Sequence, residues 1–275
     1  MTALASKAAV DHRHWARYLQ AAVDERREIS GIGAQLDCGL SIDDAYLIQD
    51  ALIDARLWRG ESLAGAKLGL TSKAKQEQMG VGEPAYGWVP RSSVLGSDAD
   101  VDVDMLIHPR AEPEFVFLIG LELCGPDVTA EQVLDATASV VGGIEIIDSR
   151  YEAFKFTLPD VIADNTSAAR VAIGKCGVAP RDVDLRTVTC TFTVDGVVTG
   201  EATGEALLGD PAECVAMLVR NLARTDRGLA AGWLVMAGAP VDARPFGLGT
   251  VAVATYSHFG DVTVRAVGTQ AGAST

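Results

Sequence analysis

The first 60 residues carry apolar side chains three and four positions apart, which is the spacing of one helix face. This pattern predicts helices in HWARYLQAAVDERREIS and in SIDDAYLIQDALIDARLWRG. Ser41 and Asp44 predict a cap at the start of the second helix, and Gly60 predicts its end. The run LAGAKLGLT then predicts a strand, and SKAKQEQM predicts a further helix.

From about residue 90 onward, short apolar runs rich in β-branched residues alternate with turn signals, a pattern typical of strands. The dipeptide Asp195-Gly196 separates two of these runs and favours a tight hairpin, because such a turn needs positive φ angles. The runs that predict strands are FVFLIG, VVGGIEII, ARVAIG, TVTCTFTV, WLVMAG, TVAVATYS and VTVRAV.

Two helices are expected to interrupt these strands. TAEQVLDATASV begins with a capping box of Thr129 and Gln132, and DPAECVAMLVRNLAR begins with Asp210 as its cap. The whole pattern predicts an α+β fold in one integrated unit. Its expected parts are a helical and αβ N-terminal part, residues 1–90, and a mainly β body, residues 91–275.

Charge and composition narrow the classes of partner. The 275 residues carry a formal net charge of -14, which repels nucleic acid and anionic lipid surfaces. The five cysteines form no C-x-x-C pair and suggest neither a disulfide framework nor a zinc site. The N-terminus lacks a continuous apolar region, and no later run is long enough for a transmembrane helix. We therefore expect a cytoplasmic protein.

The segment HPRAEPEFVFLIG, residues 108–120, places two glutamates at the head of an apolar strand. Side chains alternate between the faces of a strand, so Glu112 and Glu114 are expected to point the same way. Glu145 interrupts a second apolar run, VVGGIEII. Buried carboxylates are costly unless they are paired, protonated or bound to a cation, so the sequence predicts a convergent acidic group with a partner.

Two kinds of partner suit these carboxylates. Three oxygen donors without a nearby His or Cys suit a hard divalent ion such as Mg²⁺ or Mn²⁺, and a structural Ca²⁺ is a weaker alternative. Arg110 or Arg150 is the other choice, as an ion-pair partner. The residues alone leave both readings open.

Lys67 stands among small and apolar residues in GAKLGLTS. A desolvated lysine there can serve as an acid, a base or a countercharge, although a lysine that extends to the surface is the alternative. Thr71 and Ser72 follow and can cap a helix or bind an anion. ADNTS, which ends at Ser167, reads as a turn, and no nucleophile elbow, phosphate loop or dinucleotide fingerprint occurs.

Four segments together resemble the hydratase/decarboxylase branch of the fumarylacetoacetate hydrolase superfamily. They are GAKLGLTSKAKQEQMGV, HPRAEPEFVF, IEIIDSRYEAFKFTLPDVIADNTSA and GEALLGDPAECVAMLV, and the similarity runs in order over about residues 40–268. The resemblance implies the mixed β-roll of the superfamily's C-terminal domain. It also implies a metal-dependent enzyme of aromatic meta-cleavage catabolism that acts on a short unsaturated 2-oxo acid.

The resemblance also implies roles for single residues. The family's E-x-E pair and later Glu, which ligate Mg²⁺ or Mn²⁺, match Glu112, Glu114 and Glu145. Its lysine matches Lys67, which is expected to hold the distal carboxylate of the substrate or to manage a proton. The residues expected to contact or orient the substrate are Thr71, Ser72, Asp164, Asn165 and Ser167.

Two reactions occur in this branch: decarboxylation of 2-oxohex-3-enedioate (4-oxalocrotonate) and hydration of 2-hydroxypenta-2,4-dienoate. Ala85 in GEPAYG favours decarboxylation, because hydratases of the branch usually carry an acidic residue there. No histidine lies between His14 and His108, which argues against the hydrolytic members. The alternatives are a hydratase and a non-catalytic, metal-stabilised partner subunit. A homo-oligomer and a complex with a companion hydratase are also expected.

Overall fold

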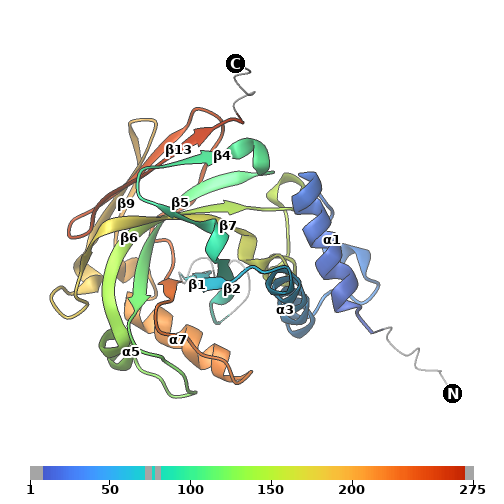
Figure 1. The fold of residues 1–275 in the computed structure, drawn as a ribbon, viewed down its shortest axis with the longest axis horizontal. Coiled ribbons are helices and arrows are strands. Elements are labelled where there is room, and N and C mark those ends of the chain that lie inside the picture. The colour runs from blue at the N-terminus through green and yellow to red at the C-terminus, as the bar shows by residue number, and fades with distance from the viewer. Residues whose placement is uncertain (1–8, 72–75, 78–81, 270–275) are drawn as a thin grey trace.

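The computed structural model describes residues 9–71, 76–77 and 82–269 (Figure 1). Its first part is helical: α1 (His12–Glu25), α2 (Ile32–Gln35) and α3 (Ile42–Trp58). The Ser41 side chain accepts a hydrogen bond from Asp44 N, so the predicted cap of α3 is confirmed. The first predicted helix is shorter than expected, because Arg26 adopts a left-handed conformation (φ 52°) and ends α1. The helix predicted in SKAKQEQM lies mainly outside the described residues.

The larger of two sheets has eight strands and contains both parallel and antiparallel pairs. It runs across the predicted division at residue 90, because strands from both sides of that position join it. Its strands in spatial order are β2 (Ala85–Pro90), β1 (Leu63–Gly69), β10 (Leu234–Met236), β5 (Pro109–Ile119), β6 (Thr137–Asp148), β7 (Ala168–Val178) and β3 (Val94–Gly96), with β11 (Arg244–Pro245) on β5.

The second sheet has five strands and lies against the first. Asp195 and Gly196 join β8 to β9 with φ angles of 50° and 78°, which confirms the predicted hairpin. The strands in order are β4 (Ala99–Asp102), β13 (Gly260–Val267), β12 (Val251–Tyr256), β8 (Thr189–Val194) and β9 (Val197–Thr203).

Three longer segments connect the strands as helices: α5 (Ala130–Ala136), α6 (Leu158–Ala163) and α7 (Pro211–Ala223). The capping box of Thr129 and Gln132 and the Asp210 cap are confirmed. The helix predicted over TAEQVLDATASV is too long, however. It stops at Ala136 because the chain from Thr137 onward is β6, which pairs along β5.

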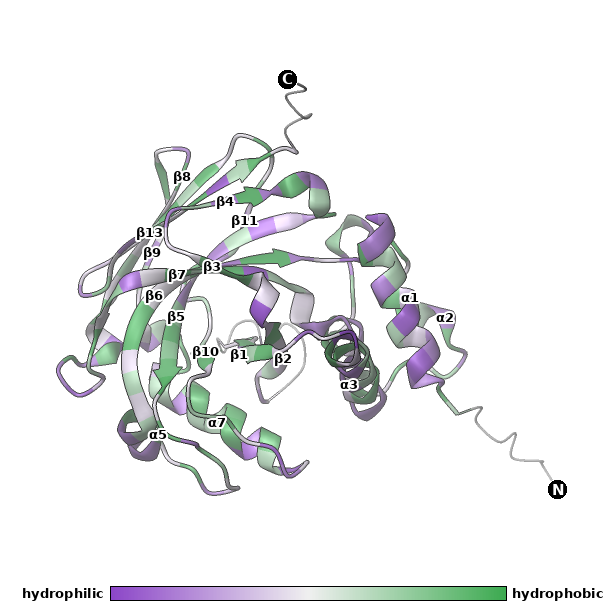
Figure 2. Cartoon of the chain, in the orientation of Figure 1, coloured by the Kyte–Doolittle hydropathy of each residue, from purple (hydrophilic) through white to green (hydrophobic). Residues whose placement is uncertain are grey.

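One hydrophobic core joins the two sheets and α7, and a second joins the N-terminal helices to α6. Phe115 and Phe117 of β5 and Phe192 of β8 belong to the first core, and all three are fully buried. The hydrophobic colouring of the central strands and of α7 follows this packing (Figure 2). The α+β prediction is thereby confirmed. Within the described residues, no helix is long and apolar enough to cross a membrane.

Candidate metal centre

Two antiparallel strands bring the predicted carboxylates together. In the β5–β6 ladder, Glu112 lies directly opposite Glu145, and Glu114 lies opposite Gly143. One ligand oxygen from each of the three glutamates lies within 4.8 Å of the others. Glu114 and Glu145 are each 1% exposed, whereas Glu112 is half-buried. The period-2 pattern of β5 and its pairing with β6 therefore build one acidic cluster.

Tyr256 of β12 holds this part of the ladder from the second sheet. Its hydroxyl lies 2.8 Å from Glu114 O and 3.0 Å from Gly143 O, both of which are acceptors. Gly142 leaves room for the ring, since a Cβ there would lie 2.5 Å from Tyr256 Cδ2. The missing side chain at Gly142 lets the second sheet reach the backbone that carries the carboxylates.

Each buried carboxylate has a different neighbour. The backbone N–H of Gly238 donates to Glu114 Oε2 at 2.8 Å, and Gly238 adopts φ 127°, which disfavours a side chain. A Cβ at Gly238 would also lie 2.0 Å from Thr71 Oγ1. Glu145 Oε2 lies 2.7 Å from Lys67 Nζ, while Glu145 Oε1 is buried without a hydrogen bond.

Burial dominates the electrostatics of the cluster. It raises the pKa of Glu145 to about 7, although the Lys67 ammonium opposes the rise. Burial, together with the charges of Glu145 and Glu112, raises the pKa of Glu114 well above its usual range. Burial alone would lower the pKa of Lys67, but Glu145 and Glu112 outweigh that effect and the pKa rises. Three carboxylates thus share one lysine, and the raised pKa values of Glu114 and Glu145 mean that these groups tend to hold protons when no cation is bound.

The donor set fits a hard divalent cation. All three groups are carboxylates, the ligand type that Mg²⁺ and Mn²⁺ prefer, and an orphaned buried Glu145 oxygen would gain a partner. The alternative ion pairs are not formed: Arg150 is paired with Asp164, and Arg110 stacks on Phe154. Lys67 is the cation beside the cluster, and its side chain is buried and does not extend to the surface.

A turn with unusual backbone geometry holds the other side of Lys67. Thr166 O accepts a hydrogen bond from Lys67 Nζ at 3.1 Å. Asn165, Thr166 and Ser167 all adopt left-handed φ angles between 51° and 58°, which is uncommon for residues other than glycine. The Asn165 side chain stabilises this turn, because it accepts from Trp88 N at 2.7 Å and donates to Trp88 O at 2.9 Å.

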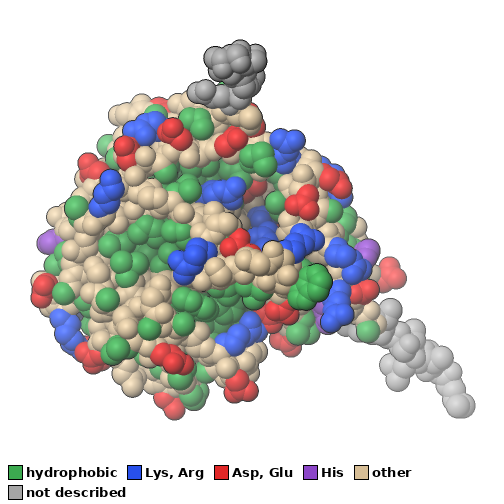
Figure 3. Space-filling model, viewed as in Figure 1, with side chains coloured by type: hydrophobic (Ala, Val, Ile, Leu, Met, Phe, Trp, Pro, Cys, Tyr) green, Lys and Arg blue, Asp and Glu red, His purple; other side chains and the backbone are tan. Residues whose placement is uncertain are grey.

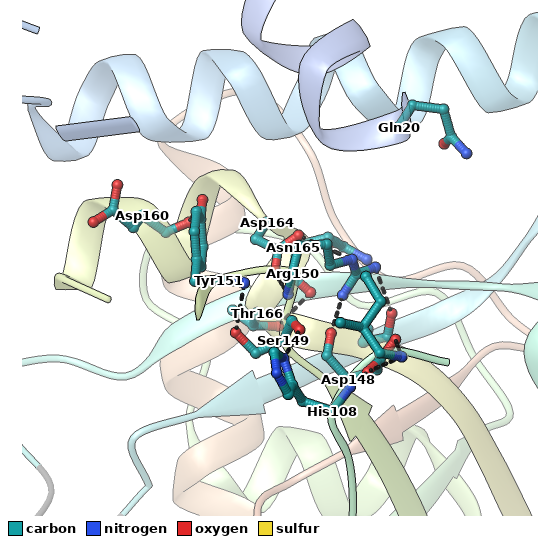
Figure 4. Close-up of polar contacts among 12 residues, drawn as sticks. Gln20, His108, Asp148, Ser149, Arg150, Tyr151, Asp160, Asp164, Asn165 and Thr166 are labelled. Atoms are coloured by element: carbon teal, nitrogen blue, oxygen red, sulfur yellow. Dashed lines mark hydrogen bonds and ion pairs between the residues drawn. The ribbon is translucent and has the colours of Figure 1, made fainter. Parts of the chain in front are cut away.

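A buried ion pair lies on the other side of the turn (Figure 4). Arg150 Nε is 3.1 Å from Asp164 Oδ1, and Asp164 is 0% exposed. Burial raises the pKa of Asp164 to about 7, against the opposing charge of Arg150. Arg150 also donates to Asp148 O at 2.5 Å and to Ala168 O at 3.4 Å. This pair anchors both ends of the segment that supports Lys67.

A cavity of about 500 Å³ opens beside the carboxylates. Of the predicted site residues, it is lined by Lys67, Thr71, Glu112, Glu114 and Ser167, and by Ala85. Ser167 Oγ is buried there without a hydrogen-bond partner. Asp164 and Asn165 are not among the lining residues, so their contact with a substrate stays a prediction, and Ser72 lies outside the described residues.

Three other cavity residues were not singled out from the sequence: Phe154, Phe156 and Arg244. Arg110, which the sequence offered only as an ion-pair partner, also lines the cavity and forms no ion pair with the described residues. Arg110 shares the face of Glu112 by strand alternation, a signal already present in the sequence. Nothing in the DARPFG segment marked Arg244. On the face shown in Figure 3, basic side chains gather across the middle, between the sheets and the N-terminal helices.

Comparison with known proteins gives one family over most of the chain. The family model described as Fumarylacetoacetate (FAA) hydrolase C-terminal matches residues 62–273. The chain is 38% identical to 4-oxalocrotonate decarboxylase of Pseudomonas sp. (strain CF600), over 82% of this chain and 86% of that protein. It is 39% identical to 2-hydroxypent-2,4-dienoate hydratase of Pseudomonas putida, over 66% of this chain and 83% of that protein.

A solved structure agrees with these matches. The structure of 4-oxalocrotonate decarboxylase from Pseudomonas putida G7, complexed with magnesium and adipate, superposes with a TM-score of 0.91 at 32% identity. The match covers 95% of this chain and 100% of that chain. The helical N-terminal part is thus included in the similarity as well as the two sheets.

Proposed function

The chain belongs to the fumarylacetoacetate hydrolase family, and from this premise we propose that it decarboxylates 2-oxohex-3-enedioate to 2-hydroxypenta-2,4-dienoate and CO₂. Relatives that are 38% and 39% identical are a decarboxylase and a dienoate hydratase, and both activities are those of lyases. The proposal assigns this chain to the same enzyme class and commits to one of the two reactions.

In this proposal Glu112, Glu114 and Glu145 hold Mg²⁺ or Mn²⁺. The cluster geometry supports it, and so does the magnesium in the structure of the similar decarboxylase. When bound, the ion supplies Lewis acidity to the 2-oxo acid end of the substrate. The Gly238 N–H fixes Glu114, and the β5–β6 ladder fixes Glu112 opposite Glu145, so the ligands are preorganised.

The reaction breaks the bond between C5 and C6, and C6 leaves as CO₂. The electron pair of that bond becomes the C4–C5 double bond, the C3–C4 pair moves to C2–C3, and the 2-oxo oxygen takes the negative charge. A proton on this oxygen completes 2-hydroxypenta-2,4-dienoate. Lys67 lies 2.7 Å from Glu145, beside the carboxylate cluster, so its ammonium is placed to stabilise that charge and donate a proton.

Ala85 is the residue on which we base the proposal of decarboxylation over hydration. It begins β2 opposite Gly69 of β1, is 4% exposed and lines the cavity. Its methyl group offers no acceptor for a proton from an attacking water at the position where hydratases of the branch usually have an acid. The cavity wall at this position therefore supports loss of CO₂ without assisting water addition.

One assay separates the three candidate functions. Purified protein with Mg²⁺ or Mn²⁺ would be given 2-oxohex-3-enedioate and, separately, 2-hydroxypenta-2,4-dienoate, while CO₂ release and dienoate absorbance are followed. Release of CO₂ from the first substrate alone is the expected result. Consumption of the dienoate without CO₂ would replace the proposal with hydratase activity, and inertness toward both would favour a non-catalytic partner subunit.

Self-association and a complex with a companion hydratase in the cytoplasm complete the proposal. Four apolar side chains on α3 support an interface, because Ile42, Leu47, Leu57 and Trp58 are between 38% and 92% exposed. Light scattering of the purified protein, alone and mixed with a dienoate hydratase, would measure the assembly. A monomer in both samples would contradict this part of the proposal.

A further inference from the structure

We propose that Arg110 binds the distal carboxylate of the substrate and makes the cavity selective for dicarboxylic 2-oxo acids. This inference rests on the proposed function, because it names the substrate class of the same site. It gives the distal carboxylate a partner other than Lys67. The support comes from strand geometry, from unpaired donors and from the arrangement of charge in the cavity.

Strand alternation places Arg110 in line with the metal-ligand candidates. Arg110, Glu112 and Glu114 lie two positions apart along β5, so their side chains belong to one face. All three line the cavity. Two residues of extended strand span about 6.8 Å. A six-carbon dicarboxylate has a similar length, so one end can lie at the carboxylate cluster while the other reaches Arg110.

The Arg110 guanidinium has donors to spare. Its central carbon lies 4.0 Å from the centre of the Phe154 ring, and it makes no hydrogen bond or ion pair with the residues that the structure describes. Stacking fixes the plane of the guanidinium but leaves its N–H edges available, which is the geometry that binds a carboxylate through two parallel hydrogen bonds. The aromatic contact therefore prepares Arg110 for an anion.

Arg244 lies on the neighbouring strand. β11 pairs with β5 so that Arg244 lies opposite Ala111, and the next residue, Pro245, lies opposite Arg110. Its Nη2 donates to Thr199 O at 2.6 Å, whereas its Nε is buried and has no partner. Residues directly opposite each other in a ladder share a face, so the Arg244 side chain lies on the face of Ala111, toward the second sheet. Of the two arginines, Arg110 is the one on the face of Glu112 and Glu114.

Charge in the cavity is divided between two regions. Glu112 and Glu114 form the acidic region with Lys67, whose ammonium is already held by Glu145 and by Thr166 O. Arg110 contributes a positive charge farther along the same face of β5, and the exposed Asp242 also lines the cavity. Lys67 is committed to the acidic region, so Arg110 is the residue placed to meet a second substrate carboxylate.

A matched pair of ligands tests the inference by binding alone. 2-Oxoadipate and 2-oxohexanoate share the 2-oxo acid end and the chain length, but only the first has a distal carboxylate. Isothermal titration of the Mg²⁺-loaded protein is expected to show at least about tenfold tighter binding of 2-oxoadipate, as befits charge-assisted hydrogen bonds. Arg110→Met is expected to remove this preference while the affinity for 2-oxohexanoate stays the same.

The controls separate recognition from general damage. Arg91→Met, at an exposed arginine outside the cavity, should keep the preference. Equal affinity of the wild type for both ligands, or an equal loss of both in Arg110→Met, would overturn the inference. Because no turnover is needed, a protein that prefers 2-oxoadipate through Arg110 but releases no CO₂ would uphold the inference and refute the proposed reaction.

Discussion

The ammonium of Lys67 lies 2.7 Å from Glu145 Oε2, so the catalytic lysine candidate and a metal-ligand candidate form one buried ion pair. Both side chains are almost fully buried, at 2% and 1% exposure. The pair means that the lysine and a bound cation would compete for the same carboxylate group. Several expected properties of the protein depend on this competition.

Removal of one carboxylate should separate metal binding from folding. Glu114→Gln is expected to weaken Mg²⁺ binding and to lower kcat at least about 100-fold, because a ligand is lost outright. The amide can still accept from Gly238 N, so far-UV circular dichroism should not change. Glu122→Gln, at an exposed glutamate, is the matched control. Full activity of Glu114→Gln after chelation and return of the metal would show the ligand assignment to be wrong.

Lys67→Met should make the protein depend on a cation for stability. The substitution leaves Glu145 buried without its positive partner, and breaking a buried pair costs about 3–5 kcal/mol when the remaining group stays charged. A bound Mg²⁺ would supply the missing charge. The rise in Tm caused by Mg²⁺, relative to EDTA, is therefore expected to be larger in Lys67→Met than in the wild type, and equal rises would refute the coupling.

The apparent affinity for Mg²⁺ should weaken as the pH is lowered. Burial raises the pKa of Glu145 to about 7 and raises that of Glu114 well above its usual range, so the ion must displace protons near neutral pH. Below pH 7 the Kd should rise, approaching about tenfold per pH unit for each proton that the ion displaces. Calorimetric titrations in buffers of different ionisation enthalpy would count the protons, and a pH-independent Kd would contradict the prediction.

The same shifts predict how the metal-free protein responds to pH. Glu145 has a folded pKa of about 7 against an ordinary value of 4.5, so between these values the folded state holds a proton that the unfolded state has released. The free energy of unfolding is therefore expected to fall as pH rises from 4.5 to 7. Urea unfolding in EDTA across this range measures it, and saturating Mg²⁺ should reduce the slope.

The left-handed turn should be stability-critical. Asn165→Ala removes the hydrogen bonds of the side chain to both Trp88 N and Trp88 O. It also places alanine at φ 51°, a left-handed conformation that asparagine tolerates better. We expect a loss of about 2–4 kcal/mol in chemical denaturation, from two buried backbone groups left unsatisfied. Asn221→Ala on α7 is the control and should change stability by less than about 0.5 kcal/mol. Similar values for the two variants would argue against this role.

Local patterns predicted the acidic face of the site. Alternation along β5 puts Glu112 and Glu114 on one side, and that rule needs no tertiary information. The partnership of Lys67 with Glu145 could not be obtained in this way, because β10 and β5 separate β1 from β6 in the sheet. Its apolar surroundings and the family resemblance made Lys67 a candidate, and the structure supplied its partner.

The turn at ADNTS and the position of Arg244 depend on tertiary contacts. ADNTS predicts a turn, but the three successive left-handed residues without glycine are fixed by contacts with Trp88 and Lys67. Arg244 enters the site because a two-residue strand pairs with β5, which is too short for periodicity to reveal. The helix predicted beyond Ala136 failed because strand pairing outweighed helical spacing.

The hydroxyl of Tyr256 contacts the backbone of both strands that carry the carboxylates, at Glu114 O and Gly143 O. The second sheet therefore cannot dissociate from the first without releasing the backbone that positions the carboxylates. Unfolding of the second sheet and loss of cation binding should occur in a single cooperative transition. A fragment that lacked β12 would keep the acidic residues in its chain, yet it would lack the brace that makes them a site.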